Sequence, residues 1–455
     1  MATVSVDAPS DIAVKTAPLS AEQRGWLERA WALIDEERIR RIDLELTRIP
    51  SPTGYERAVS ERLAQIMADA GLDAAYQPMD ENSGNAYGYV RGSGEGPSLM
   101  VYAPIDAHLD GDPALDAPWA APRLTDEMKT DAYVAENGDV IGLCAFNPKG
   151  FATVALAAAQ AVKEAGVPLK GDLIAAFAGG GMPARMPAAD ARQGHGLGSG
   201  VTYMLNHGVS PDYAIIIKPG ASVAWEEAGL CWFKATVRGQ MGYAGLTRTI
   251  PGFRNSVLHA ATFIHAIDEW LIDYQARNAS GTVAPQGCVA AVRGGWPHKP
   301  AFPSAATEVY IDVRLTPRQT TAEVKAEFAA AVESITARHP ELRVEWEMTA
   351  SYPALATDPD SWIIQSCMRG WQEVEGKEHH AGVNPVSGQH DGSAIRRMGI
   401  PTAKIGPGPV PTIPPEWRGF GGMGVAHIPD LAVAAKKIVY AVIDTCTRTR
   451  AETAG

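Results

Sequence analysis

The spacing of apolar residues changes its period along the chain, and this change most restricts the folds open to it. Before about residue 230, apolar runs at 98–105, 172–178 and 213–217 alternate with stretches of helical spacing such as 151–166. Continuous apolar runs of this length are typical of strands buried on both faces of a parallel sheet. Between residues 231 and 350, strands instead alternate apolar and polar side chains, which indicates one solvent-exposed face. The chain therefore predicts two units of different class.

The stretch with alternating strands reads strand, helix, two strands, helix, strand, which predicts a four-stranded antiparallel α+β unit. After about residue 358 the strand and helix alternation of the first part resumes. We therefore predict an α/β domain built from residues 21–230 and 351–455, with a mostly parallel sheet flanked by helices. Residues 231–350 form the α+β domain inserted into it. Residues 1–20 are predicted to be a short mobile arm.

Composition excludes several classes of partner. Among 455 residues, 40 Lys and Arg stand against 52 Asp and Glu, a net charge of −12, and no basic block interrupts them. A nucleic acid needs a basic surface, so we exclude it as a partner. No apolar run approaches the roughly 20 residues of a membrane helix, and the start lacks a signal pattern, so we expect a cytoplasmic protein without membrane contact. The five cysteines show no C-x-x-C spacing, which argues against a disulfide framework and a thiolate zinc site.

Five short phrases follow one another along the chain. They are residues 49–56, 142–150, 312–314, 399–402 with 406–408, and 426–430. In this order they resemble the aminoacylase, carboxypeptidase and succinyl-diaminopimelate desuccinylase family of dizinc peptidases and deacylases. The resemblance implies a zinc-peptidase-like fold whose inserted domain is a lid and dimerisation domain, and hence a homodimer. Function lies in the site and not in the scaffold, so the metal ligands must be compared one by one.

The resemblance implies two zinc ions held by histidines and carboxylates, with a glutamate as proton shuttle. Such a pair polarises the scissile carbonyl and supplies a hydroxide at neutral pH. Most of the implied ligands are replaced: Pro104 stands for the first His, Asn147 for the bridging Asp, Gly179 to Gly181 for a Glu-Glu pair, and Lys218 for a later carboxylate, while Asp106 and His427 keep their places. An amide and an ammonium cannot hold two divalent cations, so we expect no dizinc centre.

A two-residue shift makes His108-Leu109-Asp110 the H-x-D phrase instead, so one divalent metal on His108, Asp110 and His427 stays open. The cleft at the carboxyl ends of the strands should remain. Its catalytic candidates are Asp106, His108, Lys218 and His427, and its substrate-binding candidates are Asn147, Tyr243, Arg314, His390 and Asp391.

Several of these features also have a purely structural interpretation. Asp110 and Asp112 are typical of a solvated turn capped by its own side chains. Gly179 to Gly181 can be needed for the backbone conformation of the turn alone, and the Lys218 side chain can extend from its strand to water. Cys144 has no histidine beside it in the sequence, which favours a small buried apolar residue over a nucleophile.

Three functions stay open. The first, which we favour, is a hydrolase that cleaves an amide-like C–N bond of a small carboxylate-bearing molecule with at most one metal. The second is a metal-independent enzyme in which Lys218, His390 or His427 moves protons on a substrate anchored by Arg314. The third is a non-catalytic relative that binds a ligand.

Overall fold

The structure is a computed structural model that describes residues 12–121, 123–183, 195–220, 222–383, 386–411, 413–415, 417 and 422–454. The chain divides into two compact units. The larger unit comprises the described residues of Asp11–Trp225, Thr357–Ala381 and His390–Gly455. The inserted unit comprises those of Glu226–Ala356 and Gly382–Gln389.

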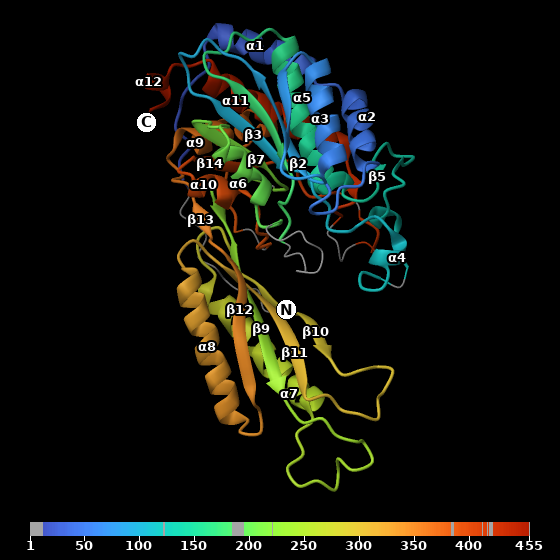
Figure 1. Cartoon of the computed structure of the whole chain (residues 1–455). Helices are drawn as coiled ribbons and strands as arrows, with labels where there is room; N and C mark the ends of the chain where they lie inside the picture. Colours follow the sequence, from blue (N-terminus) through green and yellow to red (C-terminus); the bar gives the residue numbers. More distant parts are fainter. Residues whose placement is uncertain are drawn as a thin grey trace. The chain divides into compact units, whose positions relative to one another are not determined.

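The larger unit is built on a six-stranded sheet of order β1-β2-β6-β3-β7-β14 (Figure 1). Strands β6, β3, β7 and β14 are parallel, whereas β1 and β2 pair antiparallel. The strands are β1 Asp73–Pro78, β2 Gly84–Val90, β3 Leu99–Pro104, β6 Leu173–Ala178, β7 Tyr213–Ile217 and β14 Thr402–Ile405. Every residue of β3 and β6 is buried, as expected for strands with helices on both sides. The predicted α/β fold with a mostly parallel sheet is confirmed.

The larger unit also contains helices. They are α1 Ala21–Ala32, α2 Glu36–Thr47, α3 Arg57–Asp69, α4 Pro113–Asp116, α5 Phe151–Glu164, α6 Ser199–Asn206, α9 Trp362–Glu375, α10 Gly392–Arg397, α11 Ile428–Cys446 and α12 Arg450–Thr453, with single turns at Asp126–Met128 and Ala145–Gly150. The helical pattern of residues 21–49 forms two helices because Asp35 starts a new one. Its side chain accepts a hydrogen bond of 2.9 Å from the Glu37 backbone N–H.

The inserted unit contains an antiparallel sheet of order β10-β11-β9-β12 and two helices. Its elements are β8 Glu226–Glu227, β9 Gly229–Arg238, α7 Ser256–Asn278, β10 Gly287–Gly294, β11 Ala306–Leu315, α8 Thr321–Arg338, β12 Val344–Tyr352 and β13 Leu355–Ala356. Along β11 buried and half-buried residues alternate, so one face of the sheet forms a core with the helices. The rings of Phe233 and Phe328 stack in this core with centroids 3.9 Å apart. The predicted four-stranded α+β architecture is confirmed, while its role as a lid or dimerisation domain stays a prediction.

Of the predicted mobile arm, residues 1–11 lie outside the described residues. Residues 12–20 have no regular structure but contact the larger unit: the Lys15 backbone N–H donates to Gln365 Oε1 at 2.7 Å, and Leu19 is buried. This stretch is therefore attached to α9. In the part of the chain that the structure describes, no helix combines the length and apolarity needed to cross a bilayer. The cytoplasmic location stays a prediction.

Candidate active site

Several predicted site residues follow the carboxyl ends of parallel strands in the larger unit. Asp106 comes two residues after β3, Gly179 directly after β6 and Lys218 directly after β7. Parallel strands end at the same edge of a sheet, and open α/β sheets bind ligands at that edge. The fold therefore brings these three positions to one side of the sheet.

Asp106 is fully buried, and both of its carboxylate oxygens accept hydrogen bonds from the protein. The donors are Thr53 Oγ1 at 2.8 Å, Gly181 N at 2.8 Å and Met182 N at 2.9 Å. Burial raises the pKa of Asp106 despite these bonds. The bonds fix the turn after β6 against the turn after β3, and a catalytic role for Asp106 stays a prediction.

The glycine triplet after β6 packs against acidic side chains. Gly180 N donates to Glu56 Oε1 at 2.9 Å, and burial together with the charge of Asp106 raises the pKa of Glu56 to about 7. A Cβ atom at Gly179 would lie 2.6 Å from Glu56 Cδ, and one at Gly181 would lie 2.6 Å from Asp391 Oδ2. Both positions need glycine because any side chain would clash. This supports the structural interpretation of the triplet. Glu56 was not among the predicted candidates, although it ends the phrase 49–56.

His390 and Asp391 lie next to this turn, before α10. The Tyr102 hydroxyl donates to Asp391 Oδ2, and a Cβ atom at Gly181 would also be 3.2 Å from Asp106 Oδ1, so Asp391 and Asp106 flank Gly181. His390 is buried. Burial first, and then the positive charges of Lys404, Lys218 and Arg396, lower the pKa of His390 well below its usual value. His390 is therefore a neutral imidazole among cations.

His427 is positioned by a small three-stranded sheet. Strand β15 (Val425–Ala426) pairs with β5 (Val140–Ile141), which pairs with β4 (Tyr133–Val134). In this register Ala426 faces Val140, so the next pair outward is His427 and Asp139. His427 Nδ1 lies 2.8 Å from Asp139 Oδ1, and 30% of the His427 side chain is exposed. Asp139 was not identified from the sequence.

His108 contacts a thiol rather than a carboxylate. Its Nδ1 lies 3.3 Å from Sγ of Cys144, a buried residue with a φ of +65°. Burial raises the pKa of Cys144 to about 12 and lowers the pKa of His108 to about 4. The pair is therefore uncharged at neutral pH. No local pattern could indicate this contact, because 36 positions separate the two residues.

The turn before α5 carries Asn147 and Lys149. Asn147 N donates to the Met423 carbonyl at 3.0 Å, and its Oδ1 is buried with no hydrogen-bond partner in the described structure. Lys149, which sequence reasoning missed, is fully buried and donates to Ser51 Oγ at 2.7 Å. Burial lowers the pKa of Lys149 to about 8.

The acidic loop after β3 behaves as a turn. Asp112 caps α4 by accepting a hydrogen bond of 2.9 Å from Ala114 N, and Asp110 is exposed. Among the described residues, no three His, Cys, Asp or Glu side chains are close enough to share one metal ion. His108, Asp110 and His427 thus do not form such a group in this structure.

Tyr243 and Arg314 belong to the inserted unit. Arg314 donates to both carboxylate oxygens of Asp312, at 2.7 and 2.9 Å. Tyr243 is exposed and its ring lies 5.7 Å from that of Phe302. Their contact with a substrate stays a prediction.

No protein-family model matches the chain. Solved structures share its fold over nearly the whole length. Human carnosine dipeptidase 1 is 12% identical, with a TM-score of 0.67 over 92% of this chain and 98% of that chain. An M20 family metallo-carboxypeptidase from Sulfolobus solfataricus is 13% identical, with a TM-score of 0.63 over 89% and 98%. An amidase of the hydantoinase/carbamoylase family from Burkholderia multivorans is 13% identical, with a TM-score of 0.60 over 91% and 98%. At these identities the likeness shows the fold, which is the one that the sequence resemblance implies.

Proposed function

We propose that this protein is a hydrolase that cleaves an amide-like C–N bond of a small carboxylate-bearing molecule, with His427 as general base. The proposal depends on the pair of His427 and Asp139, whose Nδ1 and Oδ1 atoms are 2.8 Å apart. Because Asp139 holds the proton on Nδ1, Nε2 is left to take a proton from water. His108 and His390 suit this role less, since burial lowers the pKa of each.

The cations around His390 support a substrate with a carboxylate. Lys218, Lys404 and Arg396 all lower the pKa of His390 through their charge, so three cationic groups lie near this point. A carboxylate placed there would form charge-assisted hydrogen bonds, which are about twice as strong as neutral ones.

Paired zinc ions take no part in the proposed reaction, because the side chains at the implied ligand positions do not suit them. Asn147 offers a neutral amide oxygen and Lys218 an ammonium group where the resemblance implies carboxylates, and an ammonium beside two divalent cations would be strongly repelled. His427 Nε2 instead takes a proton from the attacking water as its oxygen bonds to the carbonyl carbon. The resulting imidazolium then returns this proton to the leaving nitrogen as the C–N bond breaks, which gives a carboxylic acid and an amine.

The first test is hydrolysis of N-acyl amino acids, N-carbamoyl amino acids and dipeptides by the purified full chain, with and without a chelator. We expect His427→Gln to lower kcat/KM by about 100-fold or more and Asp139→Asn by about 10-fold or more. The control is His207→Gln, an exposed histidine whose Nδ1 lies 2.7 Å from the Tyr203 carbonyl, which should leave kcat/KM unchanged.

A second variant separates binding from proton transfer. If Lys218 binds the substrate carboxylate, Lys218→Met raises KM and changes kcat little. A loss confined to kcat would instead favour the open alternative in which Lys218 moves the proton. Absence of hydrolysis across the panel by the unmodified protein, or full activity of His427→Gln, would contradict the proposal.

A further inference from the structure

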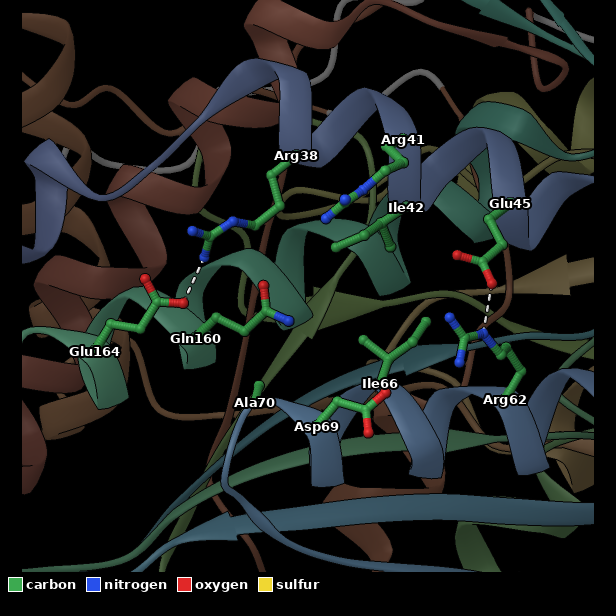
Figure 2. A pocket seen from close by; sticks show the side chains of 10 residues that line it. All are labelled: Arg38, Arg41, Ile42, Glu45, Arg62, Ile66, Asp69, Ala70, Gln160 and Glu164. Atoms are coloured by element: carbon green, nitrogen blue, oxygen red, sulfur yellow. Dashed lines mark hydrogen bonds and ion pairs between the residues drawn. The ribbon is translucent and has the colours of Figure 1, made fainter.

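A pocket of about 450 Å³ lies on the larger unit among α2, α3 and α5 (Figure 2). Its lining shares no residue with the candidate active site. The lining residues are Arg38, Arg41, Ile42, Glu45, Arg62, Ile66, Asp69, Ala70, Gln160 and Glu164. This volume is within the usual range for small-molecule sites.

The three arginines and three acidic residues of the lining are only partly matched to each other. Arg38 forms an ion pair with Glu164 at 2.6 Å, and Arg62 forms one with Glu45 at 2.5 Å. Arg41 has neither an ion pair nor a hydrogen bond within the described structure, and its guanidinium points toward the middle of the pocket (Figure 2).

Asp69 is the acidic counterpart of Arg41. Its Oδ1 accepts a hydrogen bond of 2.7 Å from Gln65 Nε2, and it has no ion pair with any described residue. Asp69 lies on α3 and Arg41 on α2, on opposite sides of the pocket in Figure 2. The pocket therefore presents one available positive group and one available negative group.

Gln160 gives a second, independent indication of a ligand. Only 7% of this residue is exposed, and Oε1 is buried without a hydrogen-bond partner among the described residues. Its amide end extends toward the centre of the pocket (Figure 2). A buried amide oxygen without a donor is energetically unfavourable, and a hydrogen bond from a ligand N–H would remove this cost. Ile42 and Ile66, both buried, supply an apolar surface beside it.

We propose that this pocket binds a free amino acid with an apolar side chain. The carboxylate pairs with Arg41, the ammonium group faces Asp69 and Gln160, and the side chain packs on Ile42 and Ile66. Positive and negative side chains balance in the lining, so a polyanion gains no net attraction, whereas a zwitterion matches both available charges. The binding does not depend on the hydrolytic activity proposed above.

The test is calorimetric titration of the full chain with L-leucine. Arg41→Ala should weaken binding by about 10-fold or more, the usual loss for a charge-assisted hydrogen bond. The control is Arg29→Ala, an exposed arginine of α1 whose Nη1 donates to the Gly25 carbonyl at 3.1 Å, and it should bind as the unmodified chain does. Arg41 is exposed, so its removal should not disturb folding, which a melting curve checks.

A ligand series isolates the ammonium contact. 2-Hydroxy-4-methylpentanoate has a hydroxyl group in place of the ammonium group of leucine and no amide bond to hydrolyse, and it should bind more weakly than leucine to the unmodified chain. In Asp69→Asn the difference in affinity between the two ligands should shrink, because the ion pair with the ammonium group is gone while its contact with Gln160 remains. Lys218→Met should keep full affinity for leucine, which separates this pocket from the candidate active site. No binding to the unmodified chain, equal affinities of the two arginine variants, or loss of binding in Lys218→Met would overturn the proposal.

Discussion

Glu127 is a carboxyl group that the fold buries at a cost. It lies in the turn Asp126–Met128, only 2% of the residue is exposed, and neither carboxylate oxygen has a full hydrogen bond within the described structure. Burial raises the pKa of Glu127 from 4.5 to about 7, and the nearby Gly424 N–H offsets only part of this effect. Because the folded chain holds this carboxyl proton more tightly than the unfolded chain, the contribution of protonated Glu127 to the free energy of unfolding is complete below pH 4.5. It is lost as the pH rises through 7.

We expect Glu127→Gln to be more stable than the unmodified chain at pH 8, by roughly 2 kcal/mol, and equally stable at pH 4. Urea unfolding at both pH values measures this difference. The matched control is Asp126→Asn, because Asp126 is a neighbour that pairs at 2.8 Å with Lys129 on the surface and should change stability by less than about 0.5 kcal/mol. A Glu127→Gln variant with the pH dependence of the unmodified chain would contradict this account.

Sequence reasoning could name single candidate residues for the site but not their partners. His427 was identified because the phrase 426–430 carries it, whereas Asp139 lies 288 positions away and is brought to it by the pairing of β5 with β15. The contact between Cys144 and His108 was missed for the same reason. Contacts between residues that lie far apart in the chain form only in the folded protein, so no local sequence pattern indicates them.

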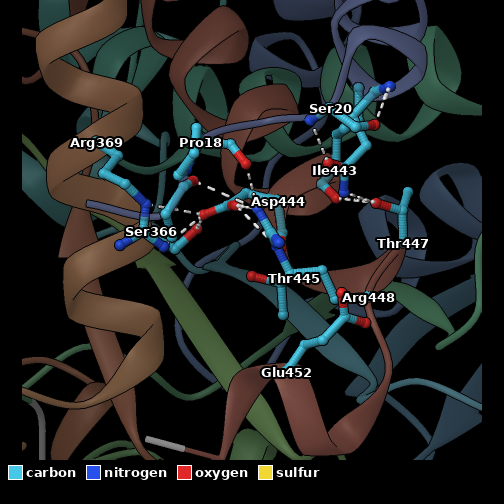
Figure 3. Close-up of polar contacts among 12 residues, drawn as sticks. Pro18, Ser20, Ser366, Arg369, Ile443, Asp444, Thr445, Thr447, Arg448 and Glu452 are labelled. Atoms are coloured by element: carbon cyan, nitrogen blue, oxygen red, sulfur yellow. Dashed lines mark hydrogen bonds and ion pairs between the residues drawn. The ribbon is translucent and has the colours of Figure 1, made fainter. Parts of the chain in front are cut away.

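Helices α9 and α11 are joined by a buried ionic network around Asp444 (Figure 3). Asp444 is fully buried, and its oxygens accept hydrogen bonds from Ser366 Oγ at 2.8 Å, Arg369 Nη2 at 2.6 Å and Arg448 Nη2 at 3.0 Å. If the negative charge of Asp444 is removed, the buried guanidinium groups that pair with it are left without a compensating charge.

We therefore expect Asp444→Asn to lower the free energy of unfolding by about 3 kcal/mol, measured in urea. The control is Asp360→Asn, which removes a surface pair with Lys15 at 3.1 Å and should have little effect. Equal losses in the two variants would show that burial does not decide the strength of the Asp444 network.

Elements with a clear period could be predicted almost to the residue. The bounds of β7 match the apolar run at 213–217, and those of β6 differ by one residue from the run at 172–178, because each strand has a continuous apolar pattern over its whole length. Strand β1 was missed: four of its six residues are half-buried and its two end residues are exposed, so it shows no alternation. Edge strands of this kind are specified by their neighbour and not by their own pattern.

For the whole molecule, the change of period along the chain correctly indicated two kinds of sheet. Each unit has its own hydrophobic core. The core of the larger unit includes Phe177 and Ile215, and the core of the inserted unit includes Phe233, Phe328 and Ile311. Separate cores predict separate cooperative units of unfolding.

This division can be tested by removing one large side chain from the inserted core. Phe328 is fully buried, and its loss should cost about 3–5 kcal/mol. We expect Phe328→Ala to accelerate amide hydrogen exchange in β9, β11 and α8, while amides in β3, β6 and β7 keep the protection of the unmodified chain. Leu63→Ala, which empties a fully buried site in the other core, should give the reverse pattern. If either variant accelerates exchange equally in both sheets, the two cores unfold as one cooperative unit. The change in apolar spacing along the chain would then mark two kinds of sheet but not two units that unfold separately.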